Sequence, residues 1–275
     1  MCKVEVVPRS LPALRLQRSP LAFALAQARI SPVLMMEEFV PRIQDRLRRA
    51  GYPWYSVSQL QEFVLGGGVG PVPEVKASTR WLFQSEKKDS AVVLSDSFIA
   101  LETVAYDTFD AFTLELERIL DVVSKLAEIP LSERIGLRYL DVIHPLDNET
   151  NVDDYLAKGI RGLNGQGLDM VGTQSRYELR GATEYGELRV RCARAFGETP
   201  IPGDLTPFDL ESPLMREASD TEVAVLDFDH FSPEARTFDT SDLIEGFWAL
   251  HDAVDRAFRE CTTDYARERW EAKPA

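Results

Sequence analysis

The sharpest chemical signal in the sequence is the phrase Asp227-Phe228-Asp229-His230, which has the residue types of a metal site. In a strand, the Asp227 and Asp229 side chains point to the same face about 7 Å apart, so they could share a divalent ion. His230 would point to the other face with Phe228, which leaves the carboxylates without a third ligand. The simpler interpretation is that Phe228 faces the core while the carboxylates face water. Asp227 and Asp229 are therefore weak metal candidates, and we expect no cofactor.

A second candidate is the segment Arg134-Ile135-Gly136-Leu137-Arg138-Tyr139, which mixes charged and aromatic side chains. If it is a strand, Arg138 shares a face with Gly136 and Leu140, and the glycine leaves room for a close approach. The arginine then either pairs with a carboxylate inside the sheet or faces a ligand groove. The default expectation is a buried ion-pair set formed by Glu133, Arg134, Arg138 and Asp141. If the protein has a functional pocket, its first candidates are Arg138, Tyr139, Arg189 and Arg191.

A third candidate is a basic helix that carries Arg42, Arg46, Arg48 and Arg49. Residues 1–50 hold nine Lys and Arg against four Asp and Glu, whereas residues 204–245 hold twelve acidic residues against two basic ones. A solvated helix face explains the arginines most simply. The alternatives are contacts of Arg42, Arg46 and Arg49 with an acidic partner protein, with nucleic acid, or with the acidic segment of a second copy. The last would produce a head-to-tail homo-oligomer.

Motifs for nucleophilic or nucleotide chemistry are incomplete. The histidines (His144, His230 and His251) and the cysteines (Cys2, Cys192 and Cys261) show no zinc spacing and no CxxC pair, and no serine has a G-x-S-x-G context. The glycine-rich loop of residues 66–70 lacks a following Gly-Lys-Ser/Thr, and two nearby prolines remove backbone donors. The sequence thus indicates no catalytic residue, and whether the protein is an enzyme stays open, with a preference for a non-enzymatic role.

Charge and hydropathy narrow the environment. The 275 residues include 45 Asp and Glu against 31 Lys and Arg, and the net charge of −14 argues against general affinity for nucleic acid or an anionic membrane. No stretch approaches the roughly 18 apolar residues of a membrane span, and the N-terminus lacks the pattern of a signal peptide. Sparse cysteines suit a reducing compartment. We expect a cytoplasmic protein with no membrane partner.

The elements that position these residues follow from apolar periodicity and turn residues. The first half predicts a strand over 21–30, a helix over 34–50, strands over 54–65, 80–84, 91–94 and 97–103, and a helix ending near 127. The second half predicts a strand over 134–143, a short helix over 152–160, strands over 177–180 and 187–196, a loop over 197–213, a strand over 222–231 and a last long helix. Both long helices begin with the phrase D-T-x-D, at 107–110 and 239–242, which suits a helix N-cap.

The two halves repeat this order of elements, which predicts an α+β fold. We expect two β-α-β(3–4)-α units, residues 21–130 and 131–275, after an N-terminal extension of residues 1–20. Their antiparallel sheets would pack against the long helices, as in saddle-shaped tandem folds such as that of the TATA-binding protein. This likeness concerns architecture and carries no function.

Several segments resemble a sporadically distributed family of uncharacterised prokaryotic proteins of similar length. They are Trp81–Ser85, Val92–Ser95 and Arg134–Ile143, together with Tyr106, Phe109 and Phe112. The resemblance covers residues from about 21 to about 270, and R-I-G-L-R-Y is its most specific part. It implies a prokaryotic source and lends no activity. A patchy distribution is compatible with an accessory role, such as phage defence or partnership in a toxin–antitoxin pair.

These features together favour a non-enzymatic binding or regulatory protein that acts on another protein. Two alternatives stay open. One is a small-ligand sensor or enzyme with a site between the two halves, and the other is nucleic-acid binding through the basic helix at 42–49.

Overall fold

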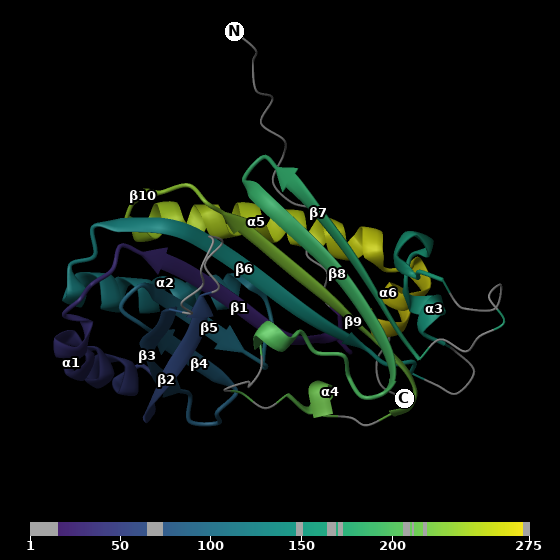
Figure 1. Cartoon of the computed structure of the whole chain (residues 1–275), viewed down its shortest axis with the longest axis horizontal. Coiled ribbons are helices and arrows are strands. Elements are labelled where there is room, and N and C mark those ends of the chain that lie inside the picture. Colours follow the sequence, from purple (N-terminus) through teal and green to yellow (C-terminus); the bar gives the residue numbers. More distant parts are fainter. Residues whose placement is uncertain are drawn as a thin grey trace, which may run out of the picture.

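The protein is built on one large antiparallel sheet (Figure 1). The computed structural model describes residues 16–64, 74–146, 151–163, 169, 173–205, 210, 212–216 and 219–271. Within them, nine strands lie side by side in the order β2-β3-β4-β5-β1-β6-β9-β8-β7, and β10 pairs with β6. The strands are β1 (Leu21–Ile30), β2 (Trp54–Val64), β3 (Glu74–Gln84), β4 (Ser90–Leu94), β5 (Phe98–Thr103), β6 (Leu131–Ile143), β7 (Gln174–Thr183), β8 (Gly186–Gly197), β9 (Ser219–Ser232) and β10 (Arg236–Thr237).

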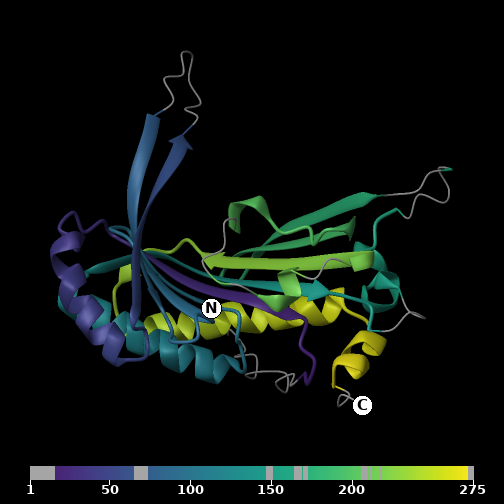
Figure 2. The ribbon, with the colours of Figure 1, turned by 90° about the horizontal axis from the view of Figure 1, so that it is seen from below.

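Three long helices lie together along one face of this sheet (Figure 2). They are α1 (Met36–Arg49), α2 (Phe109–Ala127) and α5 (Thr240–Cys261), followed at the C-terminal end by α6 (Asp264–Glu271). Their apolar stripes recur at helical spacing, as in Phe112, Leu116, Ile119 and Val123 of α2, all of which are buried. Burying these stripes against one face of the sheet produces the main hydrophobic core.

The central strands explain why one face attracts the helices. In β1, Ala24, Ala26 and Ala28 alternate with larger or polar residues and are completely buried in the main core. Small side chains at the middle of the sheet let the long helices approach closely. In β6, Leu137 and Ile143 lie on this same helix-covered face.

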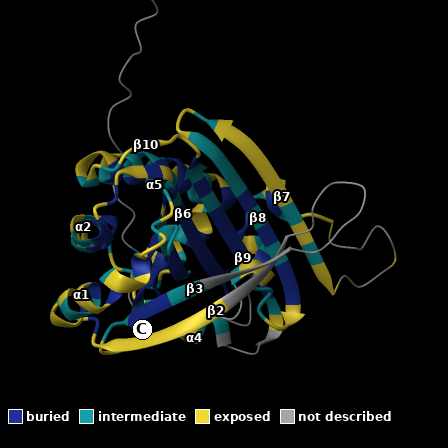
Figure 3. Ribbon diagram, turned by 60° about the vertical axis from the view of Figure 1, so that its left-hand side comes forward, coloured by how far each residue is buried: buried dark blue, intermediate teal, exposed yellow. Residues whose placement is uncertain are grey.

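The second face is covered only in part, by the connection between β8 and β9. This connection contains the 3-10 helix η3 (Gly203–Leu205) and the one-turn helix α4 (Pro213–Arg216). Leu205, Leu214 and Met215 pack on a small apolar cluster that includes Phe23 and Leu140, and the buried Leu210 packs on another. Along the outer strand β7, most residues are exposed (Figure 3).

Most predicted elements occur where the sequence placed them. The strand over 21–30 is observed with those bounds, and the helix predicted over 34–50 is observed as α1. The predicted helix over 152–160 is wrong in extent, because it consists of the four-residue α3 (Val152–Tyr155) and the 3-10 helix η1 (Lys158–Ile160). The predicted loop over 197–213 contains η3, and the helix α6 was not predicted.

The two D-T-x-D phrases cap their helices with different residues. In the first, Thr108 is the N-cap of α2 and its side chain accepts a hydrogen bond from the Ala111 backbone N–H. In the second, Asp239 is the N-cap of α5 and accepts from the Asp242 backbone N–H. The phrases are therefore offset by one position relative to their helices, and they are not structurally equivalent.

The coarse fold prediction is confirmed: α-helices and a large antiparallel sheet form a mixed α+β architecture. The sheet is continuous across the predicted division at residue 130, because β1 and β6 are hydrogen-bonded neighbours. In the described part of the chain, no helix has the length and apolar character needed to cross a bilayer.

Candidate functional site

The sheet face turned away from α1, α2 and α5, here called the open face, carries a concentration of arginines and carboxylates. Strand alternation places them there, because their neighbours in sequence point into the helix-covered core. In β9, for example, Asp227 and Asp229 lie on the open face while the completely buried Phe228 faces the helices. The set on this face comprises Arg29, Arg134, Arg138, Glu178, Arg180, Glu187, Arg189, Arg191, Asp227, Asp229 and Phe231.

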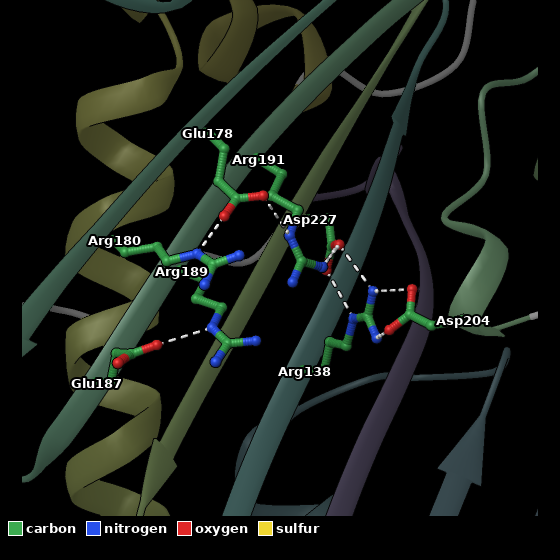
Figure 4. Close-up of polar contacts among 8 residues, drawn as sticks. All are labelled: Arg138, Glu178, Arg180, Glu187, Arg189, Arg191, Asp204 and Asp227. Atoms are coloured by element: carbon green, nitrogen blue, oxygen red, sulfur yellow. Dashed lines mark hydrogen bonds and ion pairs between the residues drawn. The ribbon is translucent and has the colours of Figure 1, made fainter. Parts of the chain in front are cut away.

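Arg138 lies at the centre of a buried ion-pair network (Figure 4). Its Nε and Nη2 donate to the two Asp227 carboxylate oxygens at 2.7 and 2.8 Å. Its Nη1 and Nη2 donate to Asp204 at 2.6 and 3.2 Å. Both contacts are bidentate, and the Arg138 and Asp227 side chains are only 8% and 2% exposed. The guanidinium is thus shared between the sheet and the β8–β9 connection.

Further charged residues of β7 and β8 extend this network. Arg191 donates to Asp227 at 2.7 Å and lies 3.4 Å from Glu178, which also pairs with Arg180. Asp227 therefore accepts from two arginines on different strands. The ion pairs involve β6, β9, β8 and β7 in turn, so they connect four neighbouring strands on one face of the sheet.

The electrostatics of Arg138 and Asp204 follow from this pairing. Burial lowers the pKa of Arg138, but its hydrogen bonds to Asp227 and Asp204 outweigh that effect and hold the pKa above its ordinary value. The same hydrogen bond from Arg138 lowers the pKa of the Asp204 carboxyl. Both groups are consequently charged at neutral pH, and the network acts as a structural clamp on the β8–β9 connection.

A pocket of about 310 Å³ lies beside the network, between β7–β8 and the start of the β8–β9 connection. Its charged lining residues are Arg176, Glu178, Arg191, Asp204 and Asp227, and Pro200, Ile201 and Pro202 form one wall. All of the lining residues belong to the second half of the chain. The pocket therefore lies within the second half, whereas the alternative prediction of a small-ligand site placed that site between the two halves.

The predicted ion-pair set around the R-I-G-L-R-Y strand is wrong in its partners. Asp141 lies on the helix-covered face, so it does not meet Arg138, whose carboxylates come from Asp227 and Asp204. Burial raises the pKa of the Asp141 carboxyl to about 8. The prediction that Arg138 pairs with carboxylates inside the fold holds, and only the identity of the carboxylates differs.

Tyr139 is separated from the other predicted pocket residues. Its hydroxyl lies 3.1 Å from Nδ1 of His251 on α5 and 3.3 Å from the Tyr106 hydroxyl, on the helix-covered face. His251 stacks on Phe109 at 3.9 Å between ring centres. Burial lowers the pKa of His251 to about 4 and raises that of Tyr139. This buried aromatic cluster joins α2, α5 and β6, on the face of the sheet opposite to the Arg138 side chain.

His230, Cys192 and Cys261 are buried in the core, His144 is half-buried, and Cys2 lies outside the described residues. His230 lies between the Thr183 hydroxyl, at 2.9 Å, and the Leu250 carbonyl, at 3.0 Å. Burial raises the pKa of the thiols of Cys192 and Cys261, to about 11 and about 12, so both are protonated at neutral pH. Among the described residues, no group of three or more His, Cys, Asp or Glu is placed to hold a metal ion. The glycine-rich loop at 66–70 lies outside the described residues.

The basic helix predicted from the arginines is observed as α1. Arg42, Arg46, Arg48 and Arg49 are all exposed. Two of them, Arg48 and Arg49, pair with Asp45 at 2.5 and 3.1 Å. The opposite side of α1 is buried through Met36, Val40, Ile43 and Leu47. The arginines therefore form a solvated helix face, part of which is neutralised within the helix.

Six residues of the open face and its ion-pair network were not singled out from the sequence: Arg29, Glu178, Arg180, Glu187, Asp204 and Phe231. Asp204 lies in a segment interpreted as a loop, 66 residues from Arg138, so no local pattern connects the two. The alternation of Glu178 and Arg180 in a strand opposite Arg189 and Arg191 carries the only usable signal, since it predicts charge pairing across two strands.

No family model matches this chain, and no curated protein matches it either. A bidentate arginine network, a small polar pocket and an exposed arginine-rich face are all means of binding anionic or polar groups.

Proposed function

We propose that this chain is a non-enzymatic binding protein that acts on a protein partner through the open face of its sheet. The observation that supports this most directly is that helices cover one face of the sheet and leave much of the other face exposed. Three long helices pack on one face, while the opposite face carries exposed and half-exposed arginines, carboxylates and Phe231. A polar, partly aromatic surface on a rigid sheet suits recognition better than it suits catalysis.

The contacts of the residues able to do acid–base or nucleophilic work also favour binding. His230 and His251 are held by hydrogen bonds in the core, and burial depresses the pKa of both imidazoles. The thiols of Cys192 and Cys261 are buried and protonated. Acid–base catalysis needs such groups to be accessible to a substrate and to titrate near the operating pH.

Affinity purification of the tagged full-length protein from its own host, with and without nuclease, tests the proposal. We expect one stoichiometric protein that is retained after nuclease treatment and is lost when the open face is altered, for instance in Arg189→Glu. Retention of the partner by that variant would place the contact elsewhere on the molecule. Recovery of the tagged protein without any stoichiometric partner, when it is produced at its natural level in the host, would contradict the proposal.

The finer fold proposal is a tandem pair of related units. The order of strands supports it, because β5 lies beside β1 and β9 lies beside β6, while β1 and β6 meet at the centre. In each half, the first strand is therefore paired with the last long strand that precedes the long helix, α2 or α5. Whether the two units unfold separately or together tests this division.

A small-ligand sensor is the second candidate, and the pocket beside Arg191 and Asp227 favours it. Its volume of about 310 Å³ and its charged lining suit a small polar molecule. A panel of nucleotides and divalent metals, scored by thermal melting, provides the test. We expect a ligand-dependent rise in Tm that Arg191→Met abolishes; a panel without any shift would count against this candidate.

A further inference from the structure

A second group of arginines on the open face gathers around one aromatic ring, outside the Arg138 network. Arg29, Arg134, Arg189 and Phe231, here called the Phe231 platform, come from β1, β6, β8 and β9. The guanidinium carbon of Arg134 lies 3.8 Å from the centre of the Phe231 ring, and that of Arg189 lies 5.2 Å from it. The two guanidinium carbons are therefore no more than about 9 Å apart. One ring thus holds two cations close together.

The strand register brings like charges directly opposite each other at this place. Arg29 is paired with Arg134 between β1 and β6, and Arg180 is paired with Arg189 between β7 and β8. Like charges at directly opposed positions destabilise an antiparallel pair. Burial lowers the pKa of Arg134 and the neighbouring Arg29 and Arg189 lower it further, while Asp229 and Glu187 oppose them. The fold therefore keeps a local excess of positive charge that costs stability.

The hydrogen-bonding capacity of these arginines is not used up. The buried Nε of Arg134 has no hydrogen-bond partner, and within the described residues neither Arg29 nor Arg134 forms an ion pair. Arg189 uses its Nε for Glu187 at 2.8 Å, and no hydrogen bond of its other two guanidinium nitrogens is found in the described part of the chain. This enclosed, unsatisfied donor costs stability, and a ligand reaches the guanidinium through its Nη groups. This is the reverse of Arg138, whose guanidinium is shared by two carboxylates.

We propose that the Phe231 platform binds carboxylates of an acidic segment in the partner protein. This proposal rests on the proposed function and assigns the chemistry of the recognised surface. The planar guanidinium matches a carboxylate in a bidentate fork, and the opposed Arg29 and Arg134 can hold one carboxylate from two sides. The ring of Phe231 covers one face of the Arg134 guanidinium, and the ligand contacts the Nη groups rather than the enclosed Nε.

An acidic peptide fits this surface better than a nucleic acid does. The carboxylates of Glu178, Glu187 and Asp229 lie among the arginines of the open face. Together with the net charge of −14, they repel a continuous polyphosphate chain. A peptide, by contrast, can present one or two carboxylates at the platform and neutral residues at the acidic positions.

Fluorescence anisotropy with a labelled ten-residue Gly-Ser peptide that carries two adjacent central glutamates tests this assignment on the full-length protein. We expect salt-dependent binding that weakens at least tenfold in the double variant Arg29→Gln/Arg134→Gln, because two charge-assisted contacts are lost. The matched control is Arg42→Gln/Arg46→Gln, which removes the same charge from the exposed face of α1 and should leave the affinity unchanged. The same peptide with glutamines in place of its two glutamates should not bind.

Several outcomes would overturn the proposal. They are absent peptide binding, equal losses in the platform and α1 variants, or tighter platform-dependent binding of an oligothymidylate than of the peptide. The last outcome would assign the platform to nucleic acid. The double variant removes an opposed pair of like charges, so we expect it to fold with an unchanged or higher Tm. If it does not fold, Arg29→Gln alone provides the same test, since Arg29 is exposed.

Failure of this proposal can be told apart from failure of the proposed function. If the wild-type protein captures a partner that the double variant captures equally well, the platform assignment is wrong and the binding function stands. If the wild type captures no partner while the peptide experiment succeeds, the platform binds carboxylates and the proposed protein-partner function is wrong.

Discussion

At the scale of single residues, Arg138 is the most constrained charge in the described structure. It is buried, and it joins Asp227 of β9 to Asp204 of the β8–β9 connection. Removing one member of such a set leaves a buried charge without its partner, which costs more than the intact pair contributes. The network thus ties the fold of the connection to the fold of the sheet.

The substitution Arg138→Met should lower the free energy of unfolding by about 3 kcal/mol, because Asp227 keeps only Arg191 as a partner. Urea denaturation at neutral pH measures this. Arg180→Met is the matched control, since Arg180 is 57% exposed in its pair with Glu178 and should contribute less than about 1 kcal/mol. Equal effects of the two substitutions would show that burial does not determine the energetics of this network.

The buried Asp141 carboxyl makes the stability of the fold depend on pH. Its pKa is raised from 3.8 to about 8 by burial, so the folded protein holds a proton that the unfolded chain releases. Its contribution to stability is complete below pH 3.8 and is lost as the pH rises through 8. His251, with its pKa lowered from 6.5 to about 4, acts in the opposite direction below pH 6.5. The effect of Asp141 is therefore isolated between pH 6.5 and pH 8.

In that window, wild-type stability should fall by up to about 1.4 kcal/mol per pH unit relative to Asp141→Asn, which cannot ionise. Urea denaturation of both proteins across the window gives the difference. Asp107→Asn, a change at an exposed position, should follow the wild type. Parallel curves for wild type and Asp141→Asn would mean that the Asp141 carboxyl ionises normally in the folded protein.

At the scale of elements, the β7–β8 hairpin depends on one glycine. Gly186 has a φ of +149°, and a Cβ at this position would lie 1.9 Å from the Phe231 carbonyl oxygen. Gly186→Ala should therefore destabilise the protein by about 2 kcal/mol or more, and it should also weaken binding of the two-glutamate peptide because it displaces Phe231. Thermal melting and anisotropy provide the two measurements. Gly181→Ala in the same hairpin, where nothing lies within 4 Å, should be neutral in both.

The caps of the long helices provide a second test at this scale. Thr108→Ala and Asp239→Ala should each cost about 1 kcal/mol, because each removes the side chain that accepts from the first turn. Asp107→Ala should have almost no effect, although Asp107 occupies the same place in its phrase as Asp239 does. Denaturation midpoints of the three variants decide the question. A loss in Asp107→Ala equal to that in Asp239→Ala would contradict the offset between the phrases.

Local patterns in the sequence located the helices and strands, but they could not reveal which side chains meet across the sheet. Periodicity found the strands and helices, and alternation along β6 placed Arg138 and Asp141 on opposite faces. It could not find the partners of Arg138, because Asp227 lies 89 residues away and β9 pairs with β6 across two intervening strands in sequence. The role of Phe231 could not be predicted either, because the arginines around it are also distant from it in sequence. The platform exists only after four strands from both halves have been brought together.

At the scale of the whole molecule, the two halves share one sheet and one core. The main apolar cluster includes Phe83 and Leu116 from the first half and Phe228 and Phe247 from the second. We therefore expect the two predicted units to unfold together. The sequence has four tryptophans, and Trp81 and Trp270 are buried in opposite halves. Variants that keep only one of these two as a fluorescent probe should give coincident urea midpoints. Separated midpoints would show two independent domains.

The position of β1 has a consequence for how the protein is made. Ala26 pairs with Leu101 on one side and with Leu137 on the other, so β1, which is made before both of its partner strands, lies in the middle of the finished sheet. Its first partner is synthesised more than 70 residues later, and its second more than 100 residues later. During that interval the nascent chain holds an apolar strand with an open edge. The order of translation thus makes β6, the strand that carries Arg138, the element that closes this edge and brings the two halves together.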